Sequence, residues 1–405
     1  MQGMYKLSSH CCYVKGTSGA AIYDLYNGTV FSLNADGREI IDRALRGEDV
    51  GKYGSFMHDL CDRSLFNCMQ YGQLSDITKP EPSLRYVWLE LTSRCNCHCL
   101  HCYGAFGSPD REQIDQELSI AEWKDILNTV RKTGCSAIQF IGGEPLLHPD
   151  FDELLSYAYN IGINSIDIFT NGCFLSSNTA QLIKKAGASV RVSLYGYDVT
   201  SHENITQCKG SFAALDKSLD LLRELHIPTR IAVVLMRENQ EALKKIIAYI
   251  EAKGHRYSGC DTVRKVRHSA QNSHAVTDPD ILQLRNMLKP NFVTSVEDFS
   301  RNKFWNSCWY GKFAVTSCGD ILPCIFARDL RCGNVRHDAQ TMIRDKLLGY
   351  WEITKDKIDV CKECEFRYAC DDCRPLAMGE YADIWGKYPR CFYHPGSCEW
   401  APAHP

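Results

Sequence analysis

Four thiols lie within eight residues of one loop, and three of them are spaced to hold a metal cluster. Cys95, Cys99 and Cys102 follow the pattern C-x3-C-x2-C, with Cys97 between the first two. An apolar run at 86–91 precedes them, so we expect the loop beyond the carboxyl end of a β-strand. Buried apolar cysteines, a disulfide-bonded loop or a structural zinc site are the alternatives, although such zinc sites usually take four ligands. Three thiolates can instead bind three irons of a [4Fe–4S] cube and leave the fourth iron open.

The composition indicates an ordinary globular protein of two or three domains. The 405 residues are 44% hydrophobic and 23% charged, and the formal net charge of −3 gives no sign of nucleic acid or an anionic membrane as partner. The start of the chain lacks the apolar core of a signal peptide, and no apolar run is long enough to span a membrane. We therefore expect a cytoplasmic protein, in which the 22 cysteines are metal ligands or reactive thiols rather than disulfides.

Residues 1–78 are predicted to form a small domain of their own. Strand candidates at 20–25 and 29–33 are joined through Asn27-Gly28, which is a strong hairpin signal, and a helix is expected over 38–45. Residues 79–83 contain two prolines and are expected to be a linker.

Residues 84–295 alternate strands and helices, which predicts parallel strands in an open sheet or a barrel. Ligands of such folds bind at the carboxyl ends of the strands, where the cysteine loop is expected. Residues 296–405 lose this periodicity and gain cysteine, which is typical of a small domain held together by metal. The expected strands are 86–91, 137–141, 165–169, 190–194 and 230–235, and the expected helices are 120–132, 151–159, 180–185, 212–225 and 240–252.

A second motif follows the strand predicted at 137–141. Gly142-Gly143 lacks side chains, so its backbone can approach a ligand closely. The carboxylate of Glu144 can accept hydrogen bonds from a cationic amine.

With the aromatic Tyr103 after the last cysteine, the loop resembles the signature of the radical S-adenosylmethionine (SAM) enzymes. In that family the open iron binds the methionine moiety of SAM, and a 5′-deoxyadenosyl radical abstracts hydrogen from a substrate. The Gly-Gly-Glu-Pro motif is similar to the one that contacts the methionine amino group. The resemblance implies a cluster held by Cys95, Cys99 and Cys102, with SAM bound by Tyr103, Gly142, Gly143, Glu144, Pro145, Asn171 and Ser193. For Asn171 and Ser193 the alternative is an ordinary turn role, and no catalytic acid or base is identified.

The carboxyl-terminal cysteines resemble the SPASM extension of the same enzymes, which binds two auxiliary [4Fe–4S] clusters. The resemblance assigns an outer cluster to Cys361, Cys364, Cys370 and Cys391, and an inner cluster to Cys308, Cys324 and Cys373. The fourth inner ligand is left open among Cys318, Cys332 and an empty position. Two residues separate Cys370 from Cys373, whereas the family usually has three. A pair of zinc sites is the alternative for these cysteines.

The amino-terminal region resembles the peptide-recognition domains of ribosomal-peptide biosynthesis in the order Tyr23-Asp24-Leu25, Val30 to Asn34 and Ile40-Ile41. These winged-helix-like modules bind a leader peptide as an added β-strand. A purely structural amino-terminal cap is the alternative.

Together these features predict an α/β fold: a partial (β/α)6 TIM-type barrel with a winged-helix-like domain before it and a SPASM domain after it. The expected cofactors are three [4Fe–4S] clusters and SAM. The expected partners are a precursor peptide and a reductant such as flavodoxin or ferredoxin, with no nucleic acid and no membrane. The expected activity is crosslinking of a precursor peptide, as a thioether or a carbon–carbon bond. The alternatives are a formylglycine-generating SPASM enzyme and a non-catalytic iron–sulfur scaffold.

Overall fold

The computed structural model describes residues 5–67, 77–107, 114–264, 266, 274–277 and 292–400. The chain divides into two compact units. Unit 1 contains Met1–Glu81, Asn286–Tyr310 and Trp351–Pro405, and unit 2 contains Pro82–Arg285 and Gly311–Tyr350. The predicted domain boundaries stay predictions, and the compact units divide the chain differently, because residues 311–350 group with the strand–helix region.

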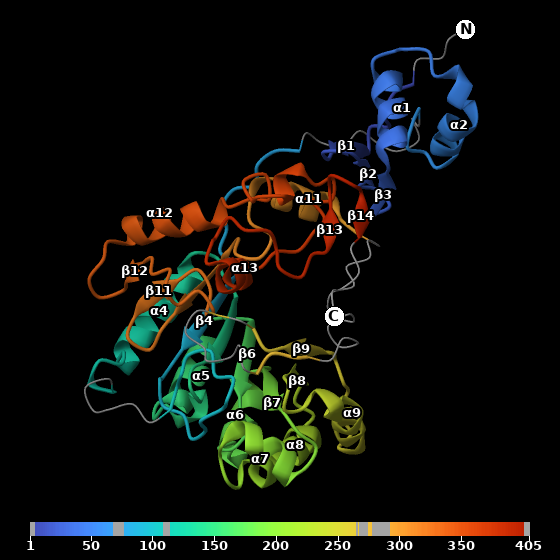
Figure 1. Cartoon of the computed structure of the whole chain (residues 1–405). Coiled ribbons are helices and arrows are strands. Elements are labelled where there is room, and N and C mark those ends of the chain that lie inside the picture. Colours follow the sequence, from blue (N-terminus) through green and yellow to red (C-terminus); the bar gives the residue numbers. More distant parts are fainter. Residues whose placement is uncertain are drawn as a thin grey trace. The chain divides into compact units, whose positions relative to one another are not determined.

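Unit 2 is built on a nine-stranded sheet in the order β12-β11-β10-β4-β5-β6-β7-β8-β9, drawn in Figure 1. The strands from β10 to β9 run parallel, whereas β11 and β12 pair antiparallel. Since β12 and β9 are the two edges, the sheet stays open, and the predicted α/β fold is confirmed. The strands are β4 Tyr86–Glu90, β5 Ala137–Ile141, β6 Ser165–Thr170, β7 Ser189–Leu194, β8 Thr229–Leu235, β9 Cys260–Thr262, β10 Lys312–Val315, β11 Asp320–Leu322 and β12 Gly333–Asn334.

Helices connect the parallel strands and bury their apolar sides against the sheet. In α4, Trp123 and Leu127 are fully buried with Val87 and Leu89 of β4 in one core, and a capping box from Ser119 fixes where the helix begins. The helices are α4 Ile120–Lys132, α5 Phe151–Asn160, α6 Ser177–Lys185, α7 Val199–Thr206, α8 Ser211–Glu224, α9 Leu243–Ala252 and α12 Gln340–Trp351, with short 3-10 turns η2 Pro145–Leu147 and η3 Gln240–Ala242.

Unit 1 begins with an antiparallel sheet of β1 Cys11–Lys15, β2 Ala20–Asp24 and β3 Thr29–Leu33. Ile41 of α1 and Met57 of α2 are buried with Ile22 in a core on one face of this sheet. The remaining elements of unit 1 are α1 Ala35–Leu45, η1 Gly51–Tyr53, α2 Gly54–Asp62, α11 Val296–Phe304, η5 Cys361–Glu363, α13 Arg374–Tyr381, β13 Tyr393–His394 and β14 Glu399–Trp400.

The opposite face of the same sheet is also covered. Tyr23 is fully buried and belongs to a second core with Phe299 of α11 and with Phe366 and Tyr393 from the carboxyl-terminal segment. The ring centroids of Tyr23 and Phe299 are 4.9 Å apart. The amino-terminal sheet is therefore sandwiched between its own helices and the last third of unit 1.

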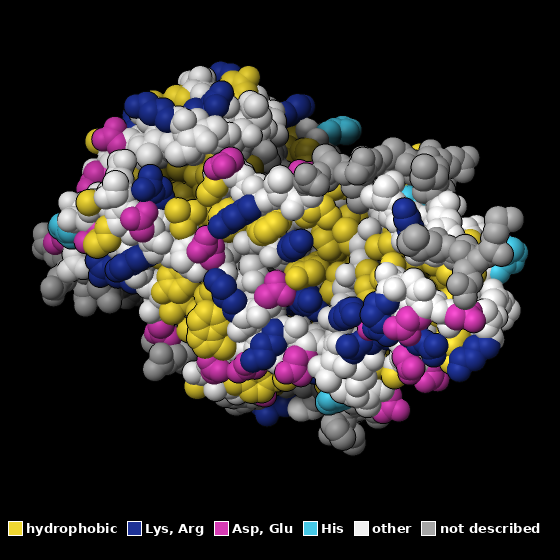
Figure 2. All heavy atoms as spheres, turned by 90° about the horizontal axis from the view of Figure 1, so that it is seen from above, with side chains coloured by type: hydrophobic (Ala, Val, Ile, Leu, Met, Phe, Trp, Pro, Cys, Tyr) yellow, Lys and Arg dark blue, Asp and Glu magenta, His cyan; other side chains and the backbone are white. Residues whose placement is uncertain are grey.

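Positive and negative side chains are interspersed over the face drawn in Figure 2, in keeping with the net charge of −3. Within the described part of the chain, no helix combines the length and apolar character needed to cross a membrane.

Candidate functional site

The cysteine loop leaves β4 at the carboxyl end of the strand and is fixed by backbone hydrogen bonds. Cys95 N donates to Gly107 O at 2.8 Å, which closes the loop on itself. His98 N and Leu100 N each donate, at 3.0 Å, to carbonyls of Thr206 and Ile205 in α7. The sequence analysis did not predict α7, the helix that holds the cysteine loop in place.

Backbone donors point at two of the three predicted ligand sulfurs. Phe106 N lies 3.4 Å from Cys102 Sγ, and Cys97 N lies 3.4 Å from Cys95 Sγ. Such N–H groups stabilise thiolates, which are the form that binds metal. Cys97 is itself 2% exposed and faces the Asn96 and Asn171 amides, with Nδ2 to Sγ distances of 3.4 and 3.7 Å.

Glycine is required at both positions of the Gly-Gly pair because the backbone of the cysteine loop packs directly against them. Gly143 N donates to Thr92 O and Glu144 N to Arg94 O, both at 2.8 Å, so the motif runs against the entry to the cysteine loop. A Cβ at Gly142 would lie 2.6 Å from Thr92 O, and one at Gly143 would collide with Arg94 O. Gly142 also has φ +154, in the range that favours glycine. The predicted close approach is therefore made to the cysteine loop.

Glu144 is a fully buried carboxylate that has no cationic partner among the described residues. It accepts hydrogen bonds from Thr170 Oγ1 and Asn171 N, both at 2.7 Å, and from Leu146 N at 3.1 Å. Burial raises the pKa of Glu144 to about 7. A buried carboxylate with a raised pKa and no cationic partner among the described residues is suited to bind a positively charged ligand.

Asn171 joins this group, whereas Ser193 lies one strand further along. Asn171 Nδ2 donates to Asn96 Oδ1 in the cysteine loop at 2.8 Å. Ser193 is buried at the carboxyl end of β7. The structure thus brings the cysteine loop, Glu144 and Asn171 together, with Ser193 on the neighbouring strand.

Sequence reasoning missed a buried ion pair beside Tyr103. Arg328 Nη1 contacts both oxygens of Glu90, at 2.6 and 2.7 Å, and the Tyr103 hydroxyl donates to Glu90 Oε1 at 3.3 Å. Glu90 is 1% exposed, at the end of β4. A carboxylate inside an otherwise apolar strand was the available signal.

Four carboxyl-terminal cysteines of unit 1 line one cavity: Cys361, Cys364, Cys370 and Cys391. These are the four thiols predicted for the outer cluster, and Lys355, Arg367 and Lys387 line the same cavity. Three cations facing four thiols suit a site that carries negative charge when loaded with metal.

The pKa shifts of the cavity side chains are consistent with a site that binds a metal through thiolates. Burial raises the pKa of Cys370 to about 12, so a bound metal would have to displace its proton. Although burial opposes its charge, the neighbouring Cys370, Asp372 and Cys361 raise the pKa of Lys355 above its ordinary value. Asp372 lies two residues after the cavity cysteine Cys370 and is shielded from solvent. It is 6% exposed and pairs with the fully buried Arg374.

The cysteines predicted for the inner cluster lie in different units, with Cys308 and Cys373 in unit 1 and Cys324 in unit 2. This ligand set therefore stays a prediction. Cys332, one option for its fourth ligand, is fully buried in the apolar core of unit 2, and burial raises its pKa to about 12.

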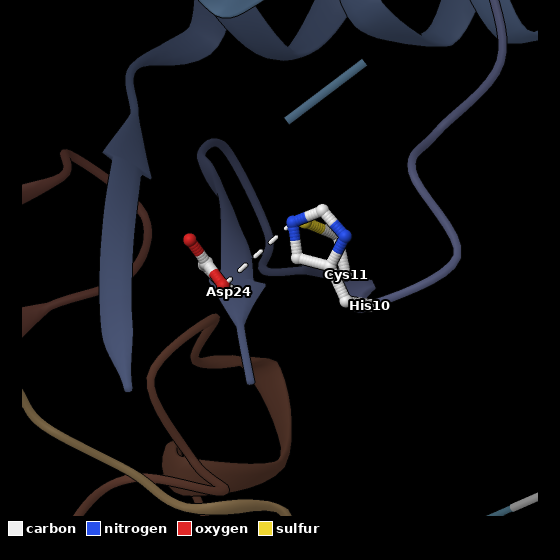
Figure 3. A group of neighbouring side chains, drawn as sticks. All are labelled: His10, Cys11 and Asp24. Carbon is white, nitrogen blue, oxygen red and sulfur yellow. Dashed lines mark ion pairs between the residues drawn. The ribbon is translucent and has the colours of Figure 1, made fainter. Parts of the chain in front are cut away.

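A compact group of His10, Cys11 and Asp24 lies at the end of the amino-terminal sheet, as Figure 3 shows. His10 Nε2 is 3.8 Å from Asp24 Oδ1. Asp24 also accepts hydrogen bonds from Tyr26 N and Asn27 N, at 3.1 and 3.0 Å, which gives it a structural role in the turn before β3.

Comparison with known proteins identifies the class. Residues 89–250 match the family model described as the radical SAM superfamily. The AdoMet-dependent heme synthase of Nitratidesulfovibrio vulgaris is 24% identical over 348 residues, covering 78% of this chain and 94% of that protein. The antilisterial bacteriocin subtilosin biosynthesis protein AlbA of Bacillus subtilis is 24% identical over 311 residues, covering 72% and 67%.

Among solved structures, Streptococcus suis SuiB bound to S-adenosylmethionine has a TM-score of 0.59 at 15% identity, covering 95% of this chain and 99% of that one. A second SuiB structure, bound to precursor peptide SuiA, has a TM-score of 0.55 at 16% identity with the same coverage. The chain is an enzyme, and its residues 89–250 match the radical SAM superfamily, a class that uses a [4Fe–4S] cluster and SAM.

Proposed function

We propose that this enzyme modifies a ribosomally made precursor peptide by abstracting hydrogen from one of its residues and forming a crosslink. The observation that carries the proposal is the extent of the similarity. The fold of SuiB, which has been solved with a precursor peptide, accounts for 95% of the chain, whereas the first heme synthase accounts for 78%. AlbA, a relative named for bacteriocin biosynthesis, supports the same substrate class.

In the proposed site Cys95, Cys99 and Cys102 hold the SAM-binding cluster. The cluster and SAM, when bound, supply a 5′-deoxyadenosyl radical as the hydrogen-abstracting agent. Glu144 accepts hydrogen bonds from the SAM amino group, and Asn171 holds the cysteine loop through Asn96. Tyr103, Gly142, Gly143, Pro145 and Ser193 complete the proposed SAM contacts.

Two auxiliary clusters are part of the proposal. The outer one takes Cys361, Cys364, Cys370 and Cys391, and the shared cavity with its three cations supports this assignment. The inner one takes Cys308, Cys324 and Cys373. Reduction by a flavodoxin or ferredoxin completes the proposed electron supply.

The amino-terminal sheet offers a strand edge for a leader peptide. β3 is an outer strand of this sheet, and Gly28 O already accepts from Thr294 N on the outer side. Thr29, the first residue of β3, forms an isolated antiparallel bridge with Val293 on the outer side. Because backbone groups alternate along a strand, Ser32 N–H points to this outer edge, beyond the bridge. Strand addition at this edge is the proposed mode of leader binding.

The test is anaerobic reconstitution with iron, sulfide, dithionite and SAM, with and without a peptide encoded by any short open reading frame found next to this gene. We expect 5′-deoxyadenosine together with a peptide that has lost two hydrogen atoms. Cofactor cleavage with an unchanged peptide would contradict the proposed substrate, and absence of cleavage would favour a scaffold. A precursor with every cysteine replaced by serine distinguishes the thioether from a carbon–carbon bond, since only the latter survives the change.

The strand edge is tested by Ser32→Pro, which removes an outward N–H without touching the ladder to β2. We expect weaker precursor binding, while Ser32→Ala binds as the native chain does. A formylglycine-generating enzyme would not need this edge, so equal activity of both variants would favour that alternative.

A further inference from the structure

The amino-terminal sheet forms one wall of the segment that carries the four-cysteine cavity. Tyr23 of β2 is buried against Phe366, which lies between the ligand candidates Cys364 and Cys370. Its hydroxyl donates to Glu365 O at 2.7 Å. The face of the sheet opposite α1 and α2 is thus covered by the chain that runs between two cavity cysteines.

The turn between β1 and β2 is bonded to the same segment on two sides. Thr17 N donates to Glu363 O at 2.8 Å, and Thr17 Oγ1 donates to Glu363 Oε2 at 3.1 Å. Ser18 Oγ donates to Gly396 O at 2.6 Å. Residue 363 directly precedes Cys364, and residue 396 lies five residues after Cys391, so the turn is bonded both to the chain beside Cys364 and to the chain beyond Cys391.

Two glycines of this turn leave room for one buried carboxylate. A Cβ at Gly19 would lie 2.7 Å from Glu365 Oε1 and 2.8 Å from Cys398 Sγ, and a Cβ at Gly16 would collide with Glu365 Oε2. Glu365 is fully buried and accepts a hydrogen bond from the Tyr393 hydroxyl. Neither glycine has positive φ, so the requirement is for space and not for backbone conformation.

Arg367 completes the connection. Its Nη1 donates to Lys15 O of β1 at 2.9 Å and to Cys364 O at 2.7 Å, while Nε contacts Asp356 Oδ1 at 2.8 Å. One guanidinium therefore joins an edge strand of the sheet to the backbone of a cavity cysteine, and the same side chain lines the cavity.

We propose that loading of the four-cysteine cavity and ordering of the amino-terminal sheet are thermodynamically coupled, with Glu365 and Arg367 as the positioning residues. The described chain around the cavity has little regular structure: η5 spans three residues, and β13 and β14 span two each. In such segments metal binding supplies much of the folding free energy. Filling the cavity fixes the wall on which Tyr23 packs, and by linkage an ordered sheet favours the filled cavity.

The inference rests on the proposed outer cluster and extends the proposed leader role. Ordering the cavity would prepare the sheet to bind a peptide, so leader recognition would occur only on a chain already loaded at this site. A consequence is that deleting residues 1–78 would also strip a wall from the cavity. Such a deletion cannot separate peptide recognition from cluster retention, which Ser32→Pro can.

The first test measures amide hydrogen exchange of β1 and β2 in the full-length reconstituted chain. In Cys364→Ala/Cys370→Ala we expect exchange over 11–15 and 20–24 to accelerate by about tenfold or more, because opening of the sheet becomes easier. The matched control is Cys95→Ala/Cys99→Ala/Cys102→Ala, which removes the proposed cluster of unit 2 and should leave those amides unchanged. Equal exchange in the cavity variant and the native chain would overturn the coupling.

The second test runs in the opposite direction. Gly19→Val places a side chain against Glu365, and we expect iron content to fall by about four atoms per chain, the complement of one cluster. Gly54→Val, where an added Cβ meets nothing within 4 Å, is the control and should keep its iron. Full iron content in Gly19→Val would also overturn the coupling. If Ser32→Pro binds precursor normally while both coupling tests succeed, the leader proposal fails and the coupling stands.

Discussion

The two cysteine sites of this enzyme are positioned by different means. In unit 2 the cysteine loop follows a strand in the middle of a nine-stranded sheet, and backbone bonds to α7 and to the Gly-Gly motif hold it. In unit 1 the four-cysteine cavity lies in chain with few regular elements, and one buried and two half-buried cations, an ion-pair network and the face of a small sheet surround it. The first site is positioned by regular elements, whereas under the proposed coupling the second site, once loaded, stabilises the fold that contains it.

The largest difference between the two sites is expected when a predicted cluster ligand is removed from unit 2. Cys99→Ala should abolish 5′-deoxyadenosine formation, because three thiolates are needed to hold the proposed cluster. The four-cysteine cavity of unit 1 should keep its iron, which Mössbauer spectroscopy can measure.

Cys97→Ala is the matched control in the same loop, and we expect it to retain cofactor cleavage. Loss of cleavage in Cys97→Ala, or retention in Cys99→Ala, would contradict the ligand assignment.

The next largest effect concerns the fold of unit 2. Glu90→Ala leaves the Arg328 guanidinium without its buried partner, so we expect the free energy of unfolding to drop by about 3–5 kcal/mol. Asp59→Ala in α2 removes an exposed pair with Arg63 and should change stability by about 0.5 kcal/mol or less. Denaturant titration of both variants measures the difference, and equal effects would mean that the Glu90 pair contributes little.

Lys355→Met removes a buried positive charge beside the cavity of unit 1. Since a cation favours the more negative, reduced state of a cluster, its loss should lower the reduction potential on the order of 100 mV. Redox titration followed by electron paramagnetic resonance would measure this. An unchanged potential would show that Lys355 acts on folding alone.

The smallest expected effect is the pH dependence of SAM binding in unit 2. The pKa of Glu144 is raised to about 7, so without ligand its carboxyl group is protonated below that pH and charged above it. The cationic SAM amino group favours the charged form, so affinity should rise as pH increases toward 7 and then level off, by at most about tenfold per pH unit.

For folding the same shift has the opposite sign, because a raised carboxyl pKa makes the ligand-free protein lose stability as pH rises from about 4.3 toward 7. Glu144→Gln should bind SAM more weakly and with a flat pH profile. Equilibrium dialysis over pH 5–8 measures both, and a sloping profile in the variant would assign the titration to another group.

Local patterns predicted the parallel part of the sheet well. The helix over 120–132 was predicted with the bounds that the structure gives, because its apolar spacing is a local signal. The core strands from β4 to β8 were found for the same reason. The short helix α7 was missed, since its apolar residues do not form a strong stripe.

The contacts that the sequence could not predict join distant segments. The pairing of β10 with β4 leaves no local trace, and neither does the fit of Gly16 and Gly19 around Glu365. The resemblance to SPASM domains grouped Cys361, Cys364, Cys370 and Cys391, and these four thiols line one cavity, whereas their binding of a metal cluster stays a prediction. It did not reveal that three cations share their cavity.

The pairing of β4 with β10 also bears on how the chain is synthesised. One edge of β4 pairs with β5, which follows soon after it in the sequence. The other edge pairs with β10, which begins more than two hundred residues later. At translation rates of about 5–20 residues per second, that edge stays open on the order of tens of seconds. While the chain is being made, β4, the strand that leads into the cysteine loop, is therefore at risk of aggregation, because an uncovered strand can pair with a neighbouring molecule. A chain whose synthesis ends before residue 312 would keep this edge exposed.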